Sequence, residues 1–179
     1  MSLVKDYFTI PNIITIGRIA TIPFFGYYIF IGEMATASIL FLFMAISDFM
    51  DGFIARKFNQ ITKLGKFLDP LADKVVIMTT IFVAGLFQVT YSIPFYFAVV
   101  ILIKELYLVV GIVVIYLFRK RFIVETLFIG KVTMFMEYLT VVMYMLSYFF
   151  PFLGIVLHYL YIITTFFAFL SIVFYTVKN

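Results

Sequence analysis

The chain has 179 residues, of which 65% are hydrophobic and only 12% carry a charge. Soluble domains carry about 25% charged residues, so this composition excludes an ordinary soluble domain. Each bilayer crossing takes about 20 apolar residues, which leaves room for roughly six crossings, and we expect one integral membrane domain over 1–179.

Two further counts narrow the function classes. The chain has no cysteine, which excludes disulfides, Cys-ligated zinc, iron–sulfur clusters and thiol nucleophiles. Its net charge of +4 predicts cytoplasmic loops that meet anionic lipid headgroups, and we expect no nucleic-acid partner.

In chain order the sequence predicts a short surface segment and then six membrane helices. Residues 1–10 mix charged and aromatic side chains before Pro11, which is typical of an amphipathic interfacial segment. The apolar segments are too long for barrel strands and lack period-2 alternation, so we predict an all-α integral membrane fold. The predicted helices cover about 12–31, 35–57, 65–88, 93–118, 124–150 and 152–177.

The basic residues predict the orientation of these helices. Loops 58–64 and 119–123 are flanked or filled by Lys and Arg, whereas the other three loops contain neither. Because cytoplasmic loops carry the excess of Lys and Arg, we expect both termini in the cytoplasm.

Four aspartates interrupt the second and third predicted helices: Asp48, Asp51, Asp69 and Asp73. A carboxylate at membrane depth costs about 3 kcal/mol or more, so four together require compensating charge. Oxygen ligands suit Mg²⁺, Mn²⁺ or Ca²⁺. In the predicted orientation all four lie in the cytoplasmic halves of their helices, which indicates a metal-centred pocket open to the cytoplasm.

Other residues around the aspartates suit a phosphate ligand. Gly52, Ala55 and Gly65 have little or no side chain, so a ligand can approach the backbone closely. Arg56 can bind a phosphate through two nitrogens. Together with a hard cation and a carboxylate able to accept a proton, this set predicts displacement at a phosphorus of a nucleotide diphosphate.

The pattern Asp48-x-x-Asp51-Gly52-x-x-Ala55-Arg56, followed by Gly65-x-x-x-Asp69-x-x-x-Asp73, resembles the signature of the CDP-alcohol phosphotransferase (phosphatidyltransferase) family. Pro11-Asn12-x-x-Thr15-x-x-Arg18 extends the resemblance upstream. The resemblance implies six transmembrane helices, a homodimer and a cytoplasm-facing site that depends on Mg²⁺ or Mn²⁺, with two ions expected. It also implies transfer of a phosphatidyl group from CDP-diacylglycerol to an alcohol, with release of CMP.

The resemblance also implies roles for single residues. Asp48, Asp51 and Asp69 would be metal ligands, and Asp73 would share the second metal or act as the base, so that Asp69 and Asp73 are the catalytic candidates. Contacts with the CDP group fall on eight residues: Asn12, Thr15, Asp48, Asp51, Gly52, Ala55, Arg56 and Gly65. The alternative is that the aspartates form structural ion pairs with Arg56, Lys66 and Lys74.

The acceptor alcohol is less sharply indicated. The entry region and the context of Asp69 resemble bacterial phosphatidylglycerophosphate synthases, which points to glycerol 3-phosphate, with Lys104, Lys131 and Arg18 as candidates for binding its phosphate. Those enzymes carry Arg-Glu and a second Arg in the fourth helix, and Gly-Lys-x-Lys-Thr in the fifth. This chain has Lys104-Glu105, lacks the second Arg, and has Thr133 where a Lys is expected.

This smaller number of basic residues also resembles the cardiolipin synthases of the same family, whose acceptor is phosphatidylglycerol. Other alcohols are further alternatives for the acceptor. Lys104 and Lys131 could instead reach the membrane surface with their side chains. Glu105 is expected to pair with a basic neighbour, and Glu137 to be an interhelical partner or a dimer contact. A divalent-cation transporter is a remote alternative. The expected location is the bacterial inner membrane, with the site facing the cytoplasm.

Overall fold

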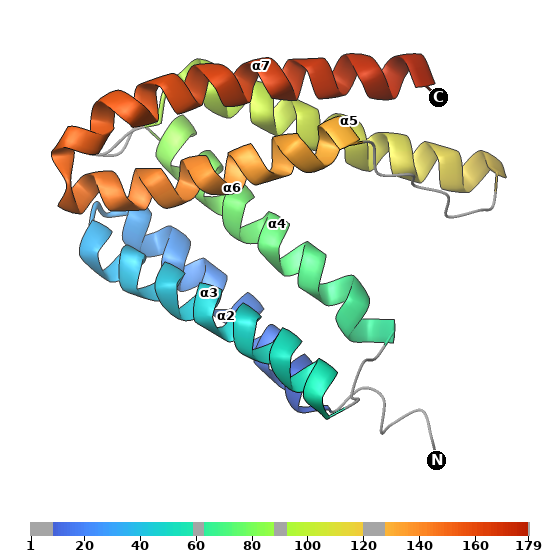
Figure 1. Cartoon of the computed structure of the whole chain (residues 1–179), viewed down its shortest axis with the longest axis horizontal. Coiled ribbons are helices and arrows are strands. Elements are labelled where there is room, and N and C mark those ends of the chain that lie inside the picture. Colours follow the sequence, from blue (N-terminus) through green and yellow to red (C-terminus); the bar gives the residue numbers. More distant parts are fainter. Residues whose placement is uncertain (1–8, 59–62, 88–92, 120–127, 179) are drawn as a thin grey trace. The chain divides into compact units, whose positions relative to one another are not determined.

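The computed structural model describes residues 9–58, 63–87, 93–119 and 128–178. These residues form six long α-helices, one short 3₁₀ turn and no strand, which confirms the predicted all-α fold (Figure 1). The helices are α2 (Ile10–Phe30), α3 (Met34–Lys57), α4 (Lys63–Leu86), α5 (Phe95–Arg119), α6 (Phe128–Phe149) and α7 (Gly154–Lys178).

The helix ends lie within four residues of the predicted ends. The expected interfacial segment 1–10 lies outside the described residues, except for Thr9 and for Ile10, which already belongs to α2. Four helical stretches of the described chain are long and apolar enough to cross a membrane: Pro11–Phe30, Met34–Asp51, Phe128–Phe149 and Pro151–Val177. The protein is therefore an integral membrane protein.

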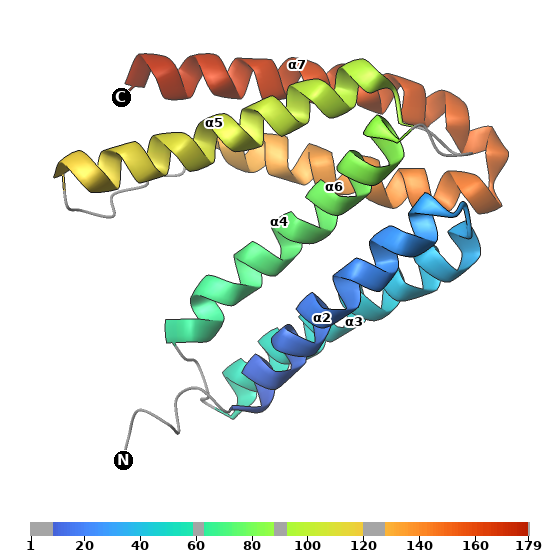
Figure 2. The ribbon, with the colours of Figure 1, turned by 180° about the vertical axis from the view of Figure 1, so that it is seen from behind.

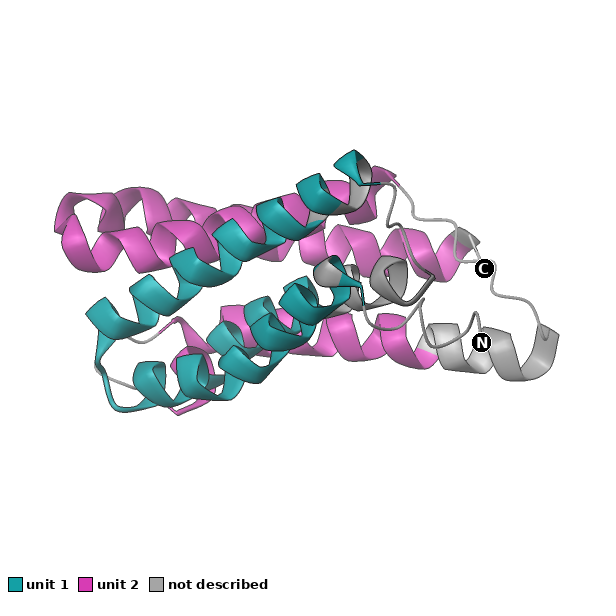
Figure 3. Ribbon diagram, turned by 90° about the horizontal axis from the view of Figure 1, so that it is seen from below, with its two compact units in different colours: residues 1–83 teal, residues 84–179 magenta. Residues whose placement is uncertain are grey.

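The chain divides into two compact units, residues 1–83 and residues 84–179 (Figure 3). The single domain predicted for 1–179 stays a prediction. In the first unit α2 and α3 lie antiparallel and side by side (Figures 1 and 2). In the second unit α7 packs on both α5 and α6.

The turn between α2 and α3 is fixed by a glycine. Gly32 has a φ of 79°, a left-handed conformation that side chains with a Cβ rarely adopt. The Gly32 amide donates to the Ile29 carbonyl at 3.0 Å, and the Glu33 amide donates to the Tyr28 carbonyl at 2.9 Å. This is the Schellman pattern, which satisfies the last carbonyls of a helix and reverses the chain. It brings the start of α3 back along α2.

Exposure follows the pattern expected for a bilayer. Large apolar side chains such as Phe24, Phe49 and Phe166 are mostly exposed. Buried polar residues, in contrast, find partners between helices: the hydroxyls of Thr140 on α6 and Thr164 on α7 lie 3.0 Å apart. Interhelical hydrogen bonds of this kind stabilise helix pairs in a membrane, where lipid is as apolar as the side chains.

Candidate active site

Arg18 on α2 is the centre of an acidic cluster in the first unit. Its Nη1 lies 2.6 Å from Asp48 Oδ1 on α3 and 3.2 Å from Asp73 Oδ1 on α4. Its Nη2 donates to Asp51 Oδ2 on α3. A single guanidinium thus gathers carboxylates from two other helices, and three of the four predicted aspartates meet at one point.

The carboxylates differ in their access to the surface. The side chains of Arg18 and Asp51 are 1% and 3% exposed, whereas those of Asp48 and Asp73 are 43% and 46% exposed. Arg18 therefore lies behind the two accessible carboxylates. Among the described side chains, three carboxylates therefore converge on one guanidinium. Carboxylates gathered at membrane depth are costly and require compensating positive charge.

Local helix geometry explains why these side chains converge. Asp48 and Asp51 are three residues apart on α3, so they project from the same face of that helix. Asn12, Thr15 and Arg18 repeat at the same spacing on α2, and all three are buried. The Thr15 hydroxyl lies 3.1 Å from Asp51 Oδ2 and 3.1 Å from the Pro11 carbonyl oxygen, so it can donate to either. The two polar faces meet because α2 packs along α3.

Several predicted site residues cannot be placed in this geometry. The side chains of Gly52, Ala55, Arg56, Gly65 and Asp69 lie outside the described residues. Of the other predicted CDP contacts, the structure places Thr15 beside Asp51 and buries Asn12 on the same helix.

The donor set fits a metal ion by its chemistry. Among the described side chains, no group of three or more His, Cys, Asp or Glu is arranged to hold a metal ion. Asp48 and Asp73 nevertheless both contact Arg18 Nη1, and carboxylate oxygens are the ligands that hard divalent cations prefer. The two accessible carboxylates are therefore of the chemical type that a divalent cation binds.

A second charged cluster lies in the second unit. Lys104 Nζ on α5 lies 2.5 Å from Glu105 Oε1 and 2.6 Å from Glu137 Oε1 on α6. All three side chains are at most 7% exposed. The expected pairing of Glu105 and the expected interhelical role of Glu137 are both realised on this one lysine. Lys104 is therefore held by two carboxylates at a position predicted to bind acceptor phosphate.

The start of α6 carries the remaining predicted acceptor residue. Lys131 is exposed, whereas its neighbours Gly130 and Thr133 are buried. The Thr133 hydroxyl donates to the Ile129 carbonyl at 2.8 Å and lies 3.2 Å from the Phe167 carbonyl oxygen on α7. Thr133 thus occupies the α6–α7 contact, where a lysine would have to bury its charge.

Sequence reasoning missed the role of Arg18 as the partner of the aspartates, having grouped it with the acceptor-phosphate residues. The signal was present in the spacing, because Asn12, Thr15 and Arg18 form one polar stripe on an otherwise apolar helix. Arg18 Nε is buried and has no hydrogen-bond partner among the described residues.

Three carboxylates gathered by one arginine on apolar helices are an unusual feature of this chain. Residues 8–174 match the family of CDP-alcohol phosphatidyltransferases, and the chain belongs to this family. It is thus a phosphatidyltransferase of the CDP-alcohol class.

Three relatives are each named CDP-diacylglycerol–glycerol-3-phosphate 3-phosphatidyltransferase. The one from Aquifex aeolicus is 35% identical over 124 residues, which cover 69% of this chain and 68% of the relative. Those from Pectobacterium atrosepticum and Escherichia coli K12 are 44% and 41% identical over 73 residues. These two matches span only 39% of this chain and 40% of each relative.

Proposed function

We propose that this protein transfers a phosphatidyl group from CDP-diacylglycerol to glycerol 3-phosphate and releases CMP. The convergence of Asp48, Asp51 and Asp73 on Arg18 carries the proposal, because it brings together the carboxylates of the family motif on apolar helices. Family membership and the names of the three relatives support the choice of donor and acceptor.

The reaction is a displacement at phosphorus. A hydroxyl oxygen of glycerol 3-phosphate forms a bond to the phosphorus that carries the diacylglycerol, and the bond from that phosphorus to the oxygen of CMP breaks. Asp73 accepts the hydroxyl proton, since its side chain is 46% exposed and can reach a bound alcohol. CMP leaves with the electron pair of the broken bond.

Two Mg²⁺ or Mn²⁺ ions complete the site. Asp48, Asp51, Asp69 and Asp73 would hold them. When bound, the ions would neutralise the diphosphate and polarise the reacting phosphorus. Arg18 keeps the carboxylates of α3 and α4 together and balances the charge of the buried Asp51.

Further residues of each unit would bind the substrates. Asn12, Thr15, Gly52, Ala55, Arg56 and Gly65 would line the CDP group together with Asp48 and Asp51. Lys131 is the strongest candidate for binding the acceptor phosphate, because its side chain is exposed. Lys104 would serve the acceptor only by exchanging a carboxylate partner for the phosphate, because two glutamates already neutralise it.

The proposed membrane arrangement is the one that the sequence predicts. The chain crosses the bilayer six times as one domain, with both termini and the site on the cytoplasmic side of a bacterial inner membrane, and it works as a homodimer. The four long apolar stretches of the described chain support this arrangement.

Phosphatidylglycerol is a second candidate acceptor, which would make the enzyme a cardiolipin synthase. Two observations favour it: Thr133 takes a buried place where a lysine is expected, and Lys104 is neutralised by two glutamates. A phosphate monoester needs several basic partners, whereas a diester carries less charge.

A detergent assay of the purified protein tests both candidates. CDP-diacylglycerol and Mg²⁺ are supplied, CMP release is followed, and glycerol 3-phosphate and phosphatidylglycerol are offered separately. We expect release with glycerol 3-phosphate. Release with phosphatidylglycerol alone would establish the second candidate, and no release with any alcohol would favour the transporter alternative.

A further inference from the structure

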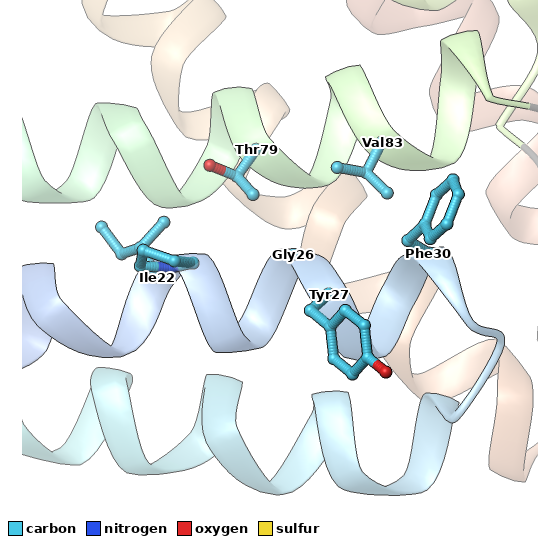
Figure 4. A pocket seen from close by; sticks show the side chains of 7 residues that line it. Ile22, Gly26, Tyr27, Phe30, Thr79 and Val83 are labelled. Carbon is cyan, nitrogen blue, oxygen red and sulfur yellow. The ribbon is translucent and has the colours of Figure 1, made fainter.

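A groove in the first unit lies on the two helices that contribute Arg18 and Asp73. It has a volume of about 420 Å³, within the range of about 300–1,000 Å³ typical of small-molecule sites. Its lining includes Ile22, Gly26, Tyr27 and Phe30 on α2, and Thr79 and Val83 on α4 (Figure 4).

Gly26 lets α2 and α4 approach closely at one edge of the groove. Thr79 and Val83 lie on the side of α4 that faces α2, opposite Gly26 (Figure 4). A Cβ added at Gly26 would lie 2.9 Å from Thr79 Cγ2 and 3.8 Å from Val83 Cγ2. The lining is apolar apart from the hydroxyls of Thr79 and Tyr27, so it suits a hydrocarbon chain.

The groove lies close to the ion pair between Arg18 and Asp73. Arg18 contacts Asp73 at 3.2 Å, and Ile22 begins the groove one helical turn beyond Arg18. At 1.5 Å per residue, about 18 Å of α2 separate Arg18 from Phe30 at the far end. On α4, Thr79 and Val83 follow Asp73 in the same direction. The groove therefore begins about one helical turn from Arg18 and runs along the membrane-spanning part of α2.

We propose that this groove binds one acyl chain of the donor lipid while the diphosphate of that lipid lies at the acidic cluster. The proposal rests on the proposed function, because it needs a donor with a charged head and a hydrocarbon tail. The acidic cluster could take the head and the groove the tail, and both lie on α2 and α4. Lipid tails surround the protein in any case, so selection comes from the shape of the groove and not from a hydrophobic driving force.

Substitutions that fill the groove test the proposal through donor chain length. Val83→Trp places a large ring in the groove, and Phe82→Trp is the matched control, since Phe82 is 45% exposed and does not line the groove. We expect Val83→Trp to raise KM about fivefold or more for a donor with long acyl chains and to leave KM for a dihexanoyl donor unchanged. Phe82→Trp should change neither value. An equal effect of Val83→Trp on both donors, or no effect, would overturn the proposal.

A binding measurement on the unsubstituted protein keeps the test independent of folding defects. A CDP-diacylglycerol analogue with a photoreactive diazirine midway along one acyl chain is illuminated with the protein, and the labelled residues are mapped. We expect labels within 22–30 and 79–83, and an excess of the long-chain donor should abolish them. Labels confined to other helices would refute the groove assignment.

This labelling needs binding but no turnover. A protein that releases no CMP from either donor would therefore overturn the proposed function, while the labels still decide whether the groove binds the acyl chain.

A second copy of the chain is the other occupant to test. Because the chain has no cysteine, Phe30→Cys gives a single thiol at the groove. We expect no disulfide-linked dimer from this variant, and efficient linkage would show that another subunit covers the groove.

Discussion

Arg18 Nη1 lies 2.6 Å from Asp48 Oδ1 and, on the other side, 3.2 Å from Asp73 Oδ1. One nitrogen on α2 thereby connects α3 to α4 at the depth where the donor phosphates are proposed to bind. The same guanidinium also neutralises the buried Asp51. Arg18 is thus the residue on which the geometry of the acidic cluster depends.

Replacing Arg18 should unfold the first unit more easily. Arg18→Gln leaves Asp51 buried without its charge partner, which lowers the free energy of unfolding by about 3–5 kcal/mol. Thermal unfolding in detergent measures this loss, and added Mg²⁺ should raise the melting temperature of the variant more than that of the wild type. Lys57→Gln is the control, since Lys57 is exposed and lies 5.5 Å from the Phe53 ring centre. Equal melting of Arg18→Gln and the wild type would contradict this account.

Replacing Asp73 should separate a proton acceptor from a simple metal ligand. Asp73→Asn removes a carboxylate that is 46% exposed, so the melting temperature should not fall. If Asp73 accepts the proton, kcat should drop by about 10²–10⁴. Raising Mg²⁺ should not restore it. Recovery of activity at high Mg²⁺ would instead assign Asp73 to metal binding alone.

Loss of Lys104 should lower the free energy of unfolding more than loss of one of its two glutamate partners does. Lys104→Met leaves Glu105 and Glu137 buried without a cation, at a cost of about 3–5 kcal/mol. Glu137→Gln keeps the pair between Lys104 and Glu105 at 2.5 Å and should cost about 1 kcal/mol. Denaturation of both variants under the same conditions decides the order, and the reverse order would show that Glu137 is the dominant partner.

The exposed Lys131 should affect the acceptor more than the donor. Lys131→Ala should raise KM for glycerol 3-phosphate about tenfold, with kcat and KM for the donor nearly unchanged, because only acceptor binding is lost. Lys57→Ala serves as the matched control, an exposed lysine on α3. Equal changes in both KM values would point to a structural role for Lys131.

The contact between α6 and α7 at Gly130 should admit a methyl group only if the Tyr175 side chain moves. A Cβ at Gly130 would lie 2.7 Å from the hydroxyl oxygen at the far end of that side chain, so Gly130→Ala should destabilise the protein by about 1 kcal/mol. In the background of Tyr175→Ala this cost should vanish, which a double-mutant cycle measures. Gly154→Ala is the control, since nothing lies within 4 Å of its added Cβ. A cost that persists in the Tyr175→Ala background would place the clash elsewhere.

The sequence by itself determined the membrane location, the six helices and the acidic motif. These are local properties: hydropathy over about 20 residues sets a span, and Gly32 marks the end of α2 through its own backbone conformation. The spacing of Asp48, Asp51 and Asp73 likewise fixes which helix faces are polar.

Only the tertiary structure decided how these faces are paired. It placed Arg18 among the aspartates, enclosed Lys104 between two glutamates, and opened a groove beside Gly26. Arg18 and Asp73 are 55 residues apart in the chain, and Lys104 and Glu137 are 33 apart. No local pattern specifies such contacts, because they depend on how packed helices rotate their side chains toward one another.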